Sequence, residues 1–391
     1  MLNGPFSPWP CFDAAEKQAV LDVMDSNKVN YWTGQQCREF EKKFAQYFES
    51  DYAVAVANGT VALDLAWQAL ALPAGSEVIV TSRTFIASVS SIVLAGLTPV
   101  FVDVERDSQN ISAATIAPHI TKNTSAILCV HLAGWPCEMD DIMALAKKHE
   151  LFVVEDCAQS HGAKYKGRST GSIGDIAAWS FCQDKIMTTA GEGGMVTTNR
   201  KDLWEKVWSF KDHGKSYSAI YEKDHPPGFR WLHESFGTNW RMLEVQASVG
   251  LKQLEKMPAW TAKRQAYGQQ IFATAQRFKA LRVPTVPDYI EHAFYKCYVF
   301  VEAQHLKADW NRDRIIEAIN ALQVPCFSGS CSEVYLEKAF DNTSYRPKQA
   351  LQTAIELGQT ALMFLVHPTL QQNEIDKCCE VLAQVMQEAS L

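Results

Sequence analysis

A lysine between two apolar segments is the residue in this sequence best placed for covalent chemistry. Lys185 follows the apolar segment 176–181 and precedes the glycine-rich turn Gly191-Glu192-Gly193-Gly194. Most lysines are solvated surface charges. A lysine withdrawn from water here would have a lowered pKa, and its amine could act as a nucleophile. Lys185 is therefore the candidate nucleophile.

A second candidate site is the turn Ala57-Asn58-Gly59-Thr60, which follows the apolar segment 52–56 and opens a predicted helix. Backbone N–H groups at a helix start attract phosphate, Gly59 permits close approach, and Thr60 adds a hydroxyl donor. The same turn could be an ordinary helix cap, because Asn and Thr are good caps, and taken alone it favours that interpretation. The dinucleotide fingerprint is absent, so a dinucleotide is not supported.

An acidic residue, Asp156, follows a third apolar segment at 151–154. An unpaired buried carboxylate is costly, so Asp156 needs a partner. That partner could be a backbone amide, a structural arginine or the protonated ring nitrogen of a cofactor. In chain order, the 57–60 turn, Asp156, Ser180 and Lys185 are the parts needed to hold pyridoxal phosphate. The helix start binds the phosphate, the carboxylate keeps the ring nitrogen protonated, and the lysine forms a Schiff base.

The elements that must position these residues alternate between strands and helices. We predict strands at 52–56, 77–80, 99–102, 125–130, 151–154, 176–181 and 194–198, with helices at 59–72, 85–95 and 139–149. Continuous apolar strands are typical of a parallel sheet with helices on both faces, which predicts an α/β fold. Ligands bind such sheets at the carboxyl ends of the strands, where the candidate residues fall.

The two ends of the chain follow other patterns. Near the start we predict a helix at 13–26 and a second helix opened by a capping box of Thr33 and Gln36. That second helix would bury Phe40, Phe44 and Phe48 on one face.

After a helix from 239 to 257, the pattern suggests a smaller α+β domain. Its predicted elements are a strand at 298–301, a helix at 312–322, a strand at 362–366 and a helix at 373–388. We therefore predict a large domain over 1–256 and a small one over 257–391. The irregular segment 212–238 fits neither and is predicted to be a lid or a partner contact.

Composition excludes several classes of protein. The 391 residues have a net charge of −7 and no basic run, which argues against nucleic acid and anionic membranes as partners. The longest apolar stretch, 85–104, contains serines, a glycine and a proline and is a poor bilayer span. No secretory signal is visible at the N-terminus. The 11 cysteines contain no Cys-x-x-Cys, so we expect reduced thiols in a cytoplasmic protein without a metal site.

The chain resembles the DegT/DnrJ/EryC1/StrS sugar aminotransferases, which are fold-type I pyridoxal-phosphate enzymes. The resemblance runs from Tyr31-Trp32-Thr33-Gly34 to His367-Pro368. The matching stretches are 58–63, 84–87, Val130-His131 with Gly134, 155–159, Ser180-Phe181 with Lys185, 191–194 and 237–242. It implies a mostly parallel central sheet with helices on both faces and a smaller C-terminal α+β domain.

The resemblance also implies roles for individual residues. Lys185 matches the Schiff-base lysine and proton shuttle, and Asp156 matches the partner of the pyridine nitrogen. Gln159 matches a contact to the cofactor ring or its 3′-oxygen, and Phe85 matches the aromatic residue that stacks on the ring. The phosphate ligands correspond to Gly59, Thr60 and Ser180. Asn239 resembles a residue that reaches the phosphate in the neighbouring subunit, which implies a homodimer with shared active sites.

Within this family, dehydratases carry His in place of the lysine, so Lys185 favours aminotransfer from an amino-acid donor, by family analogy glutamate. The family usually has an aromatic or small residue before Thr84-Phe85, but this chain has Arg83. Arg83 could bind an anionic group of the substrate or of glutamate, or it could be structural. Arg83 and the stretch Pro227–His233 resemble members that make 8-amino-3,8-dideoxy-manno-octulosonate for lipopolysaccharide, and we expect an acidic keto-sugar on that basis.

Three alternatives remain open. The first is an aminotransferase that acts on a nucleotide-linked keto-sugar, which is the family default. The second is a non-catalytic pyridoxal-phosphate-binding regulator, although no DNA-binding module or basic patch is visible. The third is a non-enzymatic α/β binding protein, which would leave the arrangement of Lys185 and the glycine-rich turn unexplained.

Overall fold

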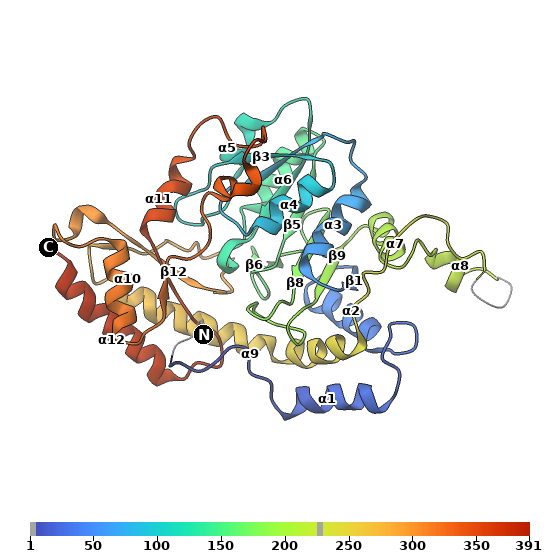
Figure 1. Ribbon diagram of the computed structural model, residues 1–391, viewed down its shortest axis with the longest axis horizontal. Coiled ribbons are helices and arrows are strands. Elements are labelled where there is room, and N and C mark those ends of the chain that lie inside the picture. The colour runs from blue at the N-terminus through green and yellow to red at the C-terminus, as the bar shows by residue number, and fades with distance from the viewer. Residues whose placement is uncertain (1–4, 225–229) are drawn as a thin grey trace.

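A seven-stranded sheet forms the centre of the computed structural model, which describes residues 5–224 and 230–391 (Figure 1). The strand order is β1-β9-β8-β5-β4-β2-β3. The bounds are β1 Tyr52–Val56, β2 Glu77–Thr81, β3 Thr98–Val102, β4 Thr124–Val130, β5 Phe152–Asp156, β8 Ile176–Ser180 and β9 Gly194–Thr198. Only β9 runs antiparallel to its neighbours β1 and β8, so the sheet is mostly parallel, as predicted.

Helices cover both faces of this sheet. Alternate side chains of β1 enter different cores: Val54 and Val56 pack in one, and Ala53 and Ala55 in the other. This alternation explains why the strands are apolar throughout. The helices of this part are α1 Ala14–Asp25, α2 Gln36–Tyr47, α3 Gly59–Leu70, α4 Ile86–Leu94, α5 Ala113–Ile116, α6 Met139–Lys148, α7 Lys201–Phe210 and α8 Tyr217–Tyr221.

The C-terminal part has its own antiparallel sheet, of order β10-β12-β14-β13, and its own core. Its strands are β10 Leu281–Arg282, β12 Cys297–Val301, β13 Cys326–Phe327 and β14 Ala361–Phe364, and its helices are α10 Arg312–Ala321, α11 Gln352–Thr360 and α12 Gln372–Ala389. A small sheet of β6 Lys164–Tyr165, β7 Arg168–Ser169 and β11 Ile290–Glu291 ties the two parts together.

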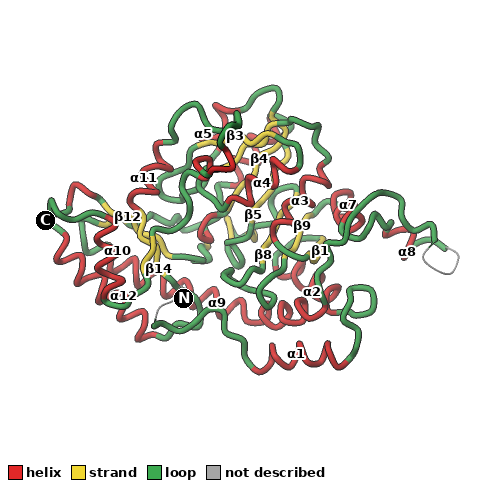
Figure 2. Tube along the Cα trace, viewed as in Figure 1, coloured by secondary structure: helices red, strands yellow, loops and turns green. Residues whose placement is uncertain are grey.

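One long helix, α9 (Glu244–Ala275), runs beneath both parts (Figure 2). The sequence predicted that this helix ends near Met257, but it continues through Pro258 for 32 residues in all. Packing on both sides holds the helix together, because residues such as Leu254 and Ile271 are buried in separate cores. The predicted division between 256 and 257 falls inside α9, and it stays a prediction.

The predicted capping box at the start of α2 is wrong. The Thr33 hydroxyl donates to the Asn30 carbonyl, and no side chain of the segment caps the helix. Instead, the buried Glu244 carboxylate accepts from the N–H groups of Gln36, at 2.5 Å, and Cys37, at 3.2 Å. An acid from the start of α9 therefore caps α2 across 208 residues of sequence.

Within the irregular segment 212–238, α8 lies at the outer edge of the molecule and projects away from the C-terminal sheet (Figure 1). Trp231 and Phe236 are almost fully exposed there, at 82% and 98%. Part of the stretch Pro227–His233 lies outside the described residues. Among the residues that the structure describes, no helix combines the length and the apolar composition of a membrane span.

Candidate active site

The loop between β8 and β9 carries Lys185 at the carboxyl end of the sheet, as predicted. Its side chain is largely buried, and Nζ lies 3.3 Å from Oδ2 of the neighbouring Asp184. The backbone of Lys185 is held at both ends: its N–H donates to the Cys182 carbonyl, and its own carbonyl accepts from the indole N–H of Trp9 at 2.9 Å. The amine is thus placed on a fixed backbone with a carboxylate beside it.

The turn after β1 and the end of β8 form one cradle. A Cβ added to Gly59 would lie 2.6 Å from the Cβ of Ser180, so only glycine fits at this contact. Asn58 caps α3 by accepting from the N–H of Val61, which leaves the first-turn N–H groups of Gly59 and Thr60 without intrahelical acceptors. These N–H groups and the hydroxyls of Thr60 and Ser180 are suited to hold a phosphate.

The carboxylate of Asp156, at the end of β5, is buried among neutral donors. Oδ2 accepts from the Ser88 hydroxyl at 2.8 Å, and Oδ1 accepts from the N–H of Ala158 at 3.1 Å. Burial raises the pKa of Asp156, although these hydrogen bonds and the charge of Lys185 oppose the shift. A buried carboxylate of this kind is stabilised by a cationic ligand group, such as a protonated ring nitrogen.

Three other predicted residues lie around the same edge of the sheet. Phe85 precedes α4 with 69% of its surface exposed, so the ring is available for stacking. Gln159 accepts from the N–H of Ala133 at 2.8 Å, which leaves its amide N–H groups to contact a ligand. Asn239 is exposed, next to Trp240, whose carbonyl accepts from the N–H of Ala57 at 2.9 Å. The partner-subunit role of Asn239 stays a prediction.

Arg83 is fully buried and links the two sheets. Nε donates to Gln109 at 2.9 Å, and Nη1 donates to Ser332 Oγ at 2.7 Å and to the Ser330 carbonyl at 3.4 Å. Both serines belong to the segment after β13, so Arg83 anchors the C-terminal part to the end of β2. Nη2 has no hydrogen-bond partner among the described residues, and burial lowers the pKa of the guanidinium.

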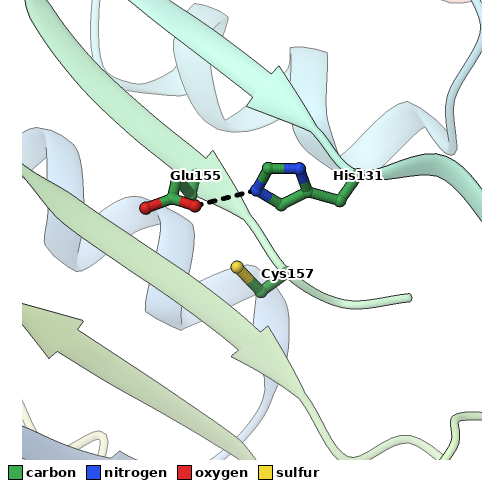
Figure 3. Close-up of side chains that lie close together, drawn as sticks. All are labelled: His131, Glu155 and Cys157. Atoms are coloured by element: carbon green, nitrogen blue, oxygen red, sulfur yellow. Dashed lines mark hydrogen bonds and ion pairs between the residues drawn. The ribbon is translucent and has the colours of Figure 1, made fainter. Parts of the chain in front are cut away.

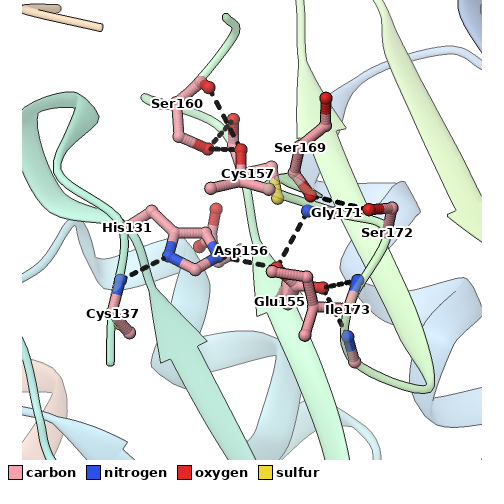
Figure 4. A network of polar contacts seen from close by, with 12 residues as sticks. His131, Cys137, Glu155, Asp156, Cys157, Ser160, Ser169, Gly171, Ser172 and Ile173 are labelled. Carbon is pink, nitrogen blue, oxygen red and sulfur yellow. Dashed lines mark hydrogen bonds and ion pairs between the residues drawn. The ribbon is translucent and has the colours of Figure 1, made fainter. Parts of the chain in front are cut away.

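The cluster of His131, Glu155 and Cys157 has the geometry of a metal site, but His131 and Glu155 are already hydrogen-bonded to each other (Figure 3). Glu155 accepts from His131 Nε2 at 2.9 Å and from the N–H groups of Gly171, Ile173 and Gly174 at 2.8, 2.9 and 2.6 Å (Figure 4). His131 Nδ1 accepts from the N–H of Cys137, so Nε2 carries the proton. Burial raises the pKa of the Cys157 thiol, which disfavours the thiolate that a metal needs.

Glu155 therefore orders the loop before β8, and Asp156 next to it faces the candidate site. The sequence left open whether the acidic residue at the end of this strand would pair with backbone amides or with a ligand. Both acids pair with backbone amides, Glu155 with three N–H groups and Asp156 with one. Pairing of Asp156 with a ligand stays a prediction. Because successive side chains of a strand point to opposite faces, Glu155 and Asp156 cannot share one environment.

Sequence reasoning missed the residues that surround the amine of Lys185. Tyr295 donates its hydroxyl to the same Asp184 oxygen that lies beside Lys185. Although burial opposes it, the charge of Lys185 and the Tyr295 hydroxyl hold the pKa of Asp184 below its usual value. Asp184 is adjacent to Lys185 in the sequence and could have been noticed. Tyr295 and Trp9 are more than 100 residues away, and no local pattern marks them.

These observations fit pyridoxal phosphate. The cradle at Gly59 and Ser180 leaves donors for a phosphate. The buried Asp156 forms no ion pair with any residue that the structure describes, and it ends β5, which neighbours the strand that Lys185 follows. Phe85 adds an exposed aromatic face at the same edge. Gly59 contacts Ser180, and Lys185 and Asp156 lie at the carboxyl ends of the neighbouring strands β8 and β5, whereas Arg83 is buried in contacts with the C-terminal part. The roles of the predicted site residues stay predictions.

Comparison with known proteins agrees with this geometry. The model of the DegT/DnrJ/EryC1/StrS aminotransferase family matches residues 10–383. An aminotransferase of known structure from Psychrobacter cryohalolentis is 60% identical, with a TM-score of 0.97 over 98% of this chain and 99% of that one.

Among curated proteins, a GDP-perosamine synthase of Caulobacter vibrioides is 36% identical over 96% of this chain and 97% of its own length. A UDP-N-acetyl-3-dehydro-α-D-glucosamine 3-aminotransferase of Acidithiobacillus ferrooxidans is 32% identical over 92% of this chain and 90% of its own. The chain is therefore a pyridoxal-phosphate-dependent enzyme that belongs to the DegT/DnrJ/EryC1/StrS aminotransferase family.

Proposed function

We propose that this aminotransferase converts the carbonyl of a nucleotide-linked keto-sugar to an amine, with an amino acid as donor. The juxtaposition of Lys185, Asp156 and the Gly59–Ser180 cradle carries the aminotransferase part of the proposal. The substrate class is supported by relatives named for GDP-linked and UDP-linked sugars. They favour this alternative over the expected acidic keto-sugar.

The residues of the site divide the work. Pyridoxal phosphate, when bound, supplies an electron-withdrawing ring that stabilises negative charge on the donor's α-carbon. Gly59, Thr60 and Ser180 hold its phosphate, and Asp156 holds a proton on its ring nitrogen. Lys185 Nζ, when free, takes the proton from the donor's α-carbon. Asp184, 3.3 Å from Nζ, keeps the amine in position.

The exposed side chains of Trp231 and Phe236 and the nearby Asn239 suggest that the enzyme works as a homodimer with shared sites. Mixing Lys185→Ala with Asn239→Ala protomers should then restore activity in the hybrid dimers. Full activity of Asn239→Ala alone would contradict the shared site.

The substrate proposal is tested by supplying the holoenzyme with an amino donor and a panel of acceptors. The panel holds GDP-, UDP- and dTDP-linked keto-sugars and a free acidic keto-sugar of the octulosonate type, and amines are detected by mass spectrometry. We expect amination of a nucleotide-linked sugar. Amination of the free acidic sugar alone would overturn the proposal and would support binding of the acidic acceptor by Arg83.

Substrate binding by Arg83 stays a prediction. Nη2 has no hydrogen-bond partner among the described residues, but it is buried together with the Nη1 contact to Ser332. Arg83→Gln separates the possibilities by half reaction. A lower rate of the sugar half reaction alone would show that Arg83 binds the acceptor. A lower rate of the amino-acid half reaction alone would show that it binds the donor. A lower unfolding temperature with both rates unchanged would show that Arg83 only anchors the C-terminal part.

A further inference from the structure

We propose that Lys296 binds a carboxylate of the amino-acid donor. The inference rests on the proposed function and names the donor subsite of the same active site. Lys296 immediately precedes β12 and comes from the C-terminal part, whereas Lys185 comes from the central sheet. The site would therefore be completed across the two parts of the chain.

The position of Lys296 relative to Lys185 follows from a shared aromatic ring. Lys296 Nζ lies 4.9 Å and Lys185 Nζ 5.4 Å from the centre of the Tyr295 ring, so the two nitrogens are at most 10.3 Å apart. A donor presents its amino nitrogen where Lys185 Nζ acts, and its carboxylate is two bonds from that nitrogen. A lysine side chain with four rotatable methylenes can close the remaining gap.

Lys296 has no ion-pair partner within 4.0 Å among the residues that the structure describes, although its side chain is largely buried. Buried lysines normally pair, because an unpaired charge loses its hydration without compensation. Asp184 is the carboxylate whose charge raises the pKa of Lys296, but it already accepts hydrogen bonds from Lys185 and from the Tyr295 hydroxyl. The ammonium of Lys296 is thus a cation without a dedicated counterion.

The surroundings add positive charge. Besides burial, the positive charges of the buried Arg264 and of Lys185 lower the pKa of Lys296, and the negative charge of Asp184 raises it. Burial first, and then Arg264, lowers the pKa of Lys296 to about 8, so most of the ammonium remains charged at neutral pH. Burial lowers the pKa of His161 to about 3 and that of His367 to about 2, so neither ring adds charge there. This local excess of cations favours an anionic ligand group.

Two anions could use this subsite, the carboxylate of the donor and the diphosphate of a nucleotide-linked acceptor. Lys296 and Lys185 both lie against the ring of Tyr295, with at most 10.3 Å between their nitrogens. This arrangement favours the donor, because its carboxylate is fixed two bonds from the reacting nitrogen. The phosphate of the cofactor has its own cradle at Gly59 and Ser180.

The test uses the holoenzyme and two non-reacting probes, glutarate for the donor and UDP for the acceptor. Dissociation constants are measured by calorimetry for wild type, Lys296→Met, Lys296→Arg and the exposed control Lys348→Met, with thermal unfolding as the check on folding. We expect Lys296→Met to weaken glutarate about tenfold or more, as for loss of a hydrogen bond to a charged group, and to leave UDP unchanged. Lys296→Arg should retain most of the glutarate affinity, and Lys348→Met all of it.

Unchanged glutarate binding in a folded Lys296→Met variant would overturn the proposal. Loss of UDP binding with intact glutarate binding would also overturn it, because Lys296 would then serve the acceptor. If Lys296→Met does not fold, Lys296→Gln takes its place with the same criteria. Failure of the proposed function looks different, because wild type would then aminate no nucleotide-linked sugar, whatever the result with glutarate.

Discussion

Gly59 and Ser180 approach so closely that a Cβ on Gly59 would stand 2.6 Å from the Cβ of Ser180. The two residues lie 121 positions apart in the sequence. Gly59 begins α3 shortly after β1, Ser180 ends β8, and β9 lies between these two strands. Their contact brings the helix start of α3 against the end of β8, which creates the phosphate cradle.

Gly59→Ala should therefore weaken cofactor binding and cost about 1–3 kcal/mol of stability, as overpacking does. Ser180→Gly in the same chain should restore much of the thermal midpoint, because it removes the atom that the new methyl group meets. Thermal unfolding and cofactor titration measure both effects. Equal midpoints for Gly59→Ala and wild type would show that the contact relaxes without cost.

Asp156→Asn should separate stability from activity. Because burial raises the pKa of Asp156, the folded cofactor-free protein disfavours its ionised form, and the stability that Asp156 contributes falls as pH rises above 3.8. The neutral variant should thus unfold at a higher temperature than wild type at pH 7 without cofactor, and the difference should shrink toward pH 3.8. Transamination should fall about 100-fold or more, because the amide cannot stabilise a protonated ring nitrogen.

Differential scanning calorimetry of the cofactor-free proteins and steady-state rates of the loaded ones measure these effects. A variant that is less stable at pH 7 and fully active would identify Asp156 as a structural acid.

His161 should make the protein sensitive to acid. Its ring lies among Phe48, Trp179 and Phe181, and neither ring nitrogen has a hydrogen-bond partner among the described residues. Burial, with smaller contributions from Lys185 and Arg264, lowers its pKa to about 3. The unfolded chain then binds the proton first, so stability is lost as pH falls from 6.5 toward 3, at ~1.4 kcal/mol per unit.

His161→Leu should remove this dependence, and the exposed His119→Leu serves as the matched control. Relative to pH 7, wild type should lose ~2 kcal/mol more than His161→Leu at pH 5 in urea unfolding. Parallel pH profiles of wild type and His161→Leu would contradict a neutral buried ring.

Glu155 is predicted to be structural and independent of metal. It accepts four hydrogen bonds, so Glu155→Gln should cost about 2–3 kcal/mol, because the amide NH₂ would face backbone donors. The exposed Glu317→Gln should cost little. Zinc or a chelator should leave the unfolding temperature of wild type unchanged, and a rise with stoichiometric zinc would show that the cluster of His131, Glu155 and Cys157 binds metal.

The strands and most helices could be predicted because apolar runs and turn residues are local signals. Lys185, Asp156 and Gly59 could be placed for the same reason, since each ends or follows an apolar strand. The sequence could not predict that Glu244 caps α2, because that acid approaches from another helix. It could not predict that Pro258 lies inside α9, because packing on two cores outweighs the lost hydrogen bond.

Arg83 shows the same limit at the site. Its position after β2 suggested a cation facing the substrate, but the burial of its guanidinium depends on Gln109 and on serines about 250 residues away. Tyr295 and Trp9 likewise contact Lys185 only through the folded arrangement of the two parts. Contacts between distant segments leave no periodicity that a sequence reading could detect.

Reduction of the loaded enzyme with borohydride, followed by peptide mapping by mass spectrometry, shows directly which lysine carries the cofactor. We expect pyridoxal phosphate to become fixed to Lys185. We expect Lys185→Ala neither to fix the cofactor nor to transaminate, while it still binds the cofactor through the cradle at Gly59 and Ser180. Fixation to another lysine such as Lys296, or near-normal transamination by Lys185→Ala, would contradict this role of Lys185.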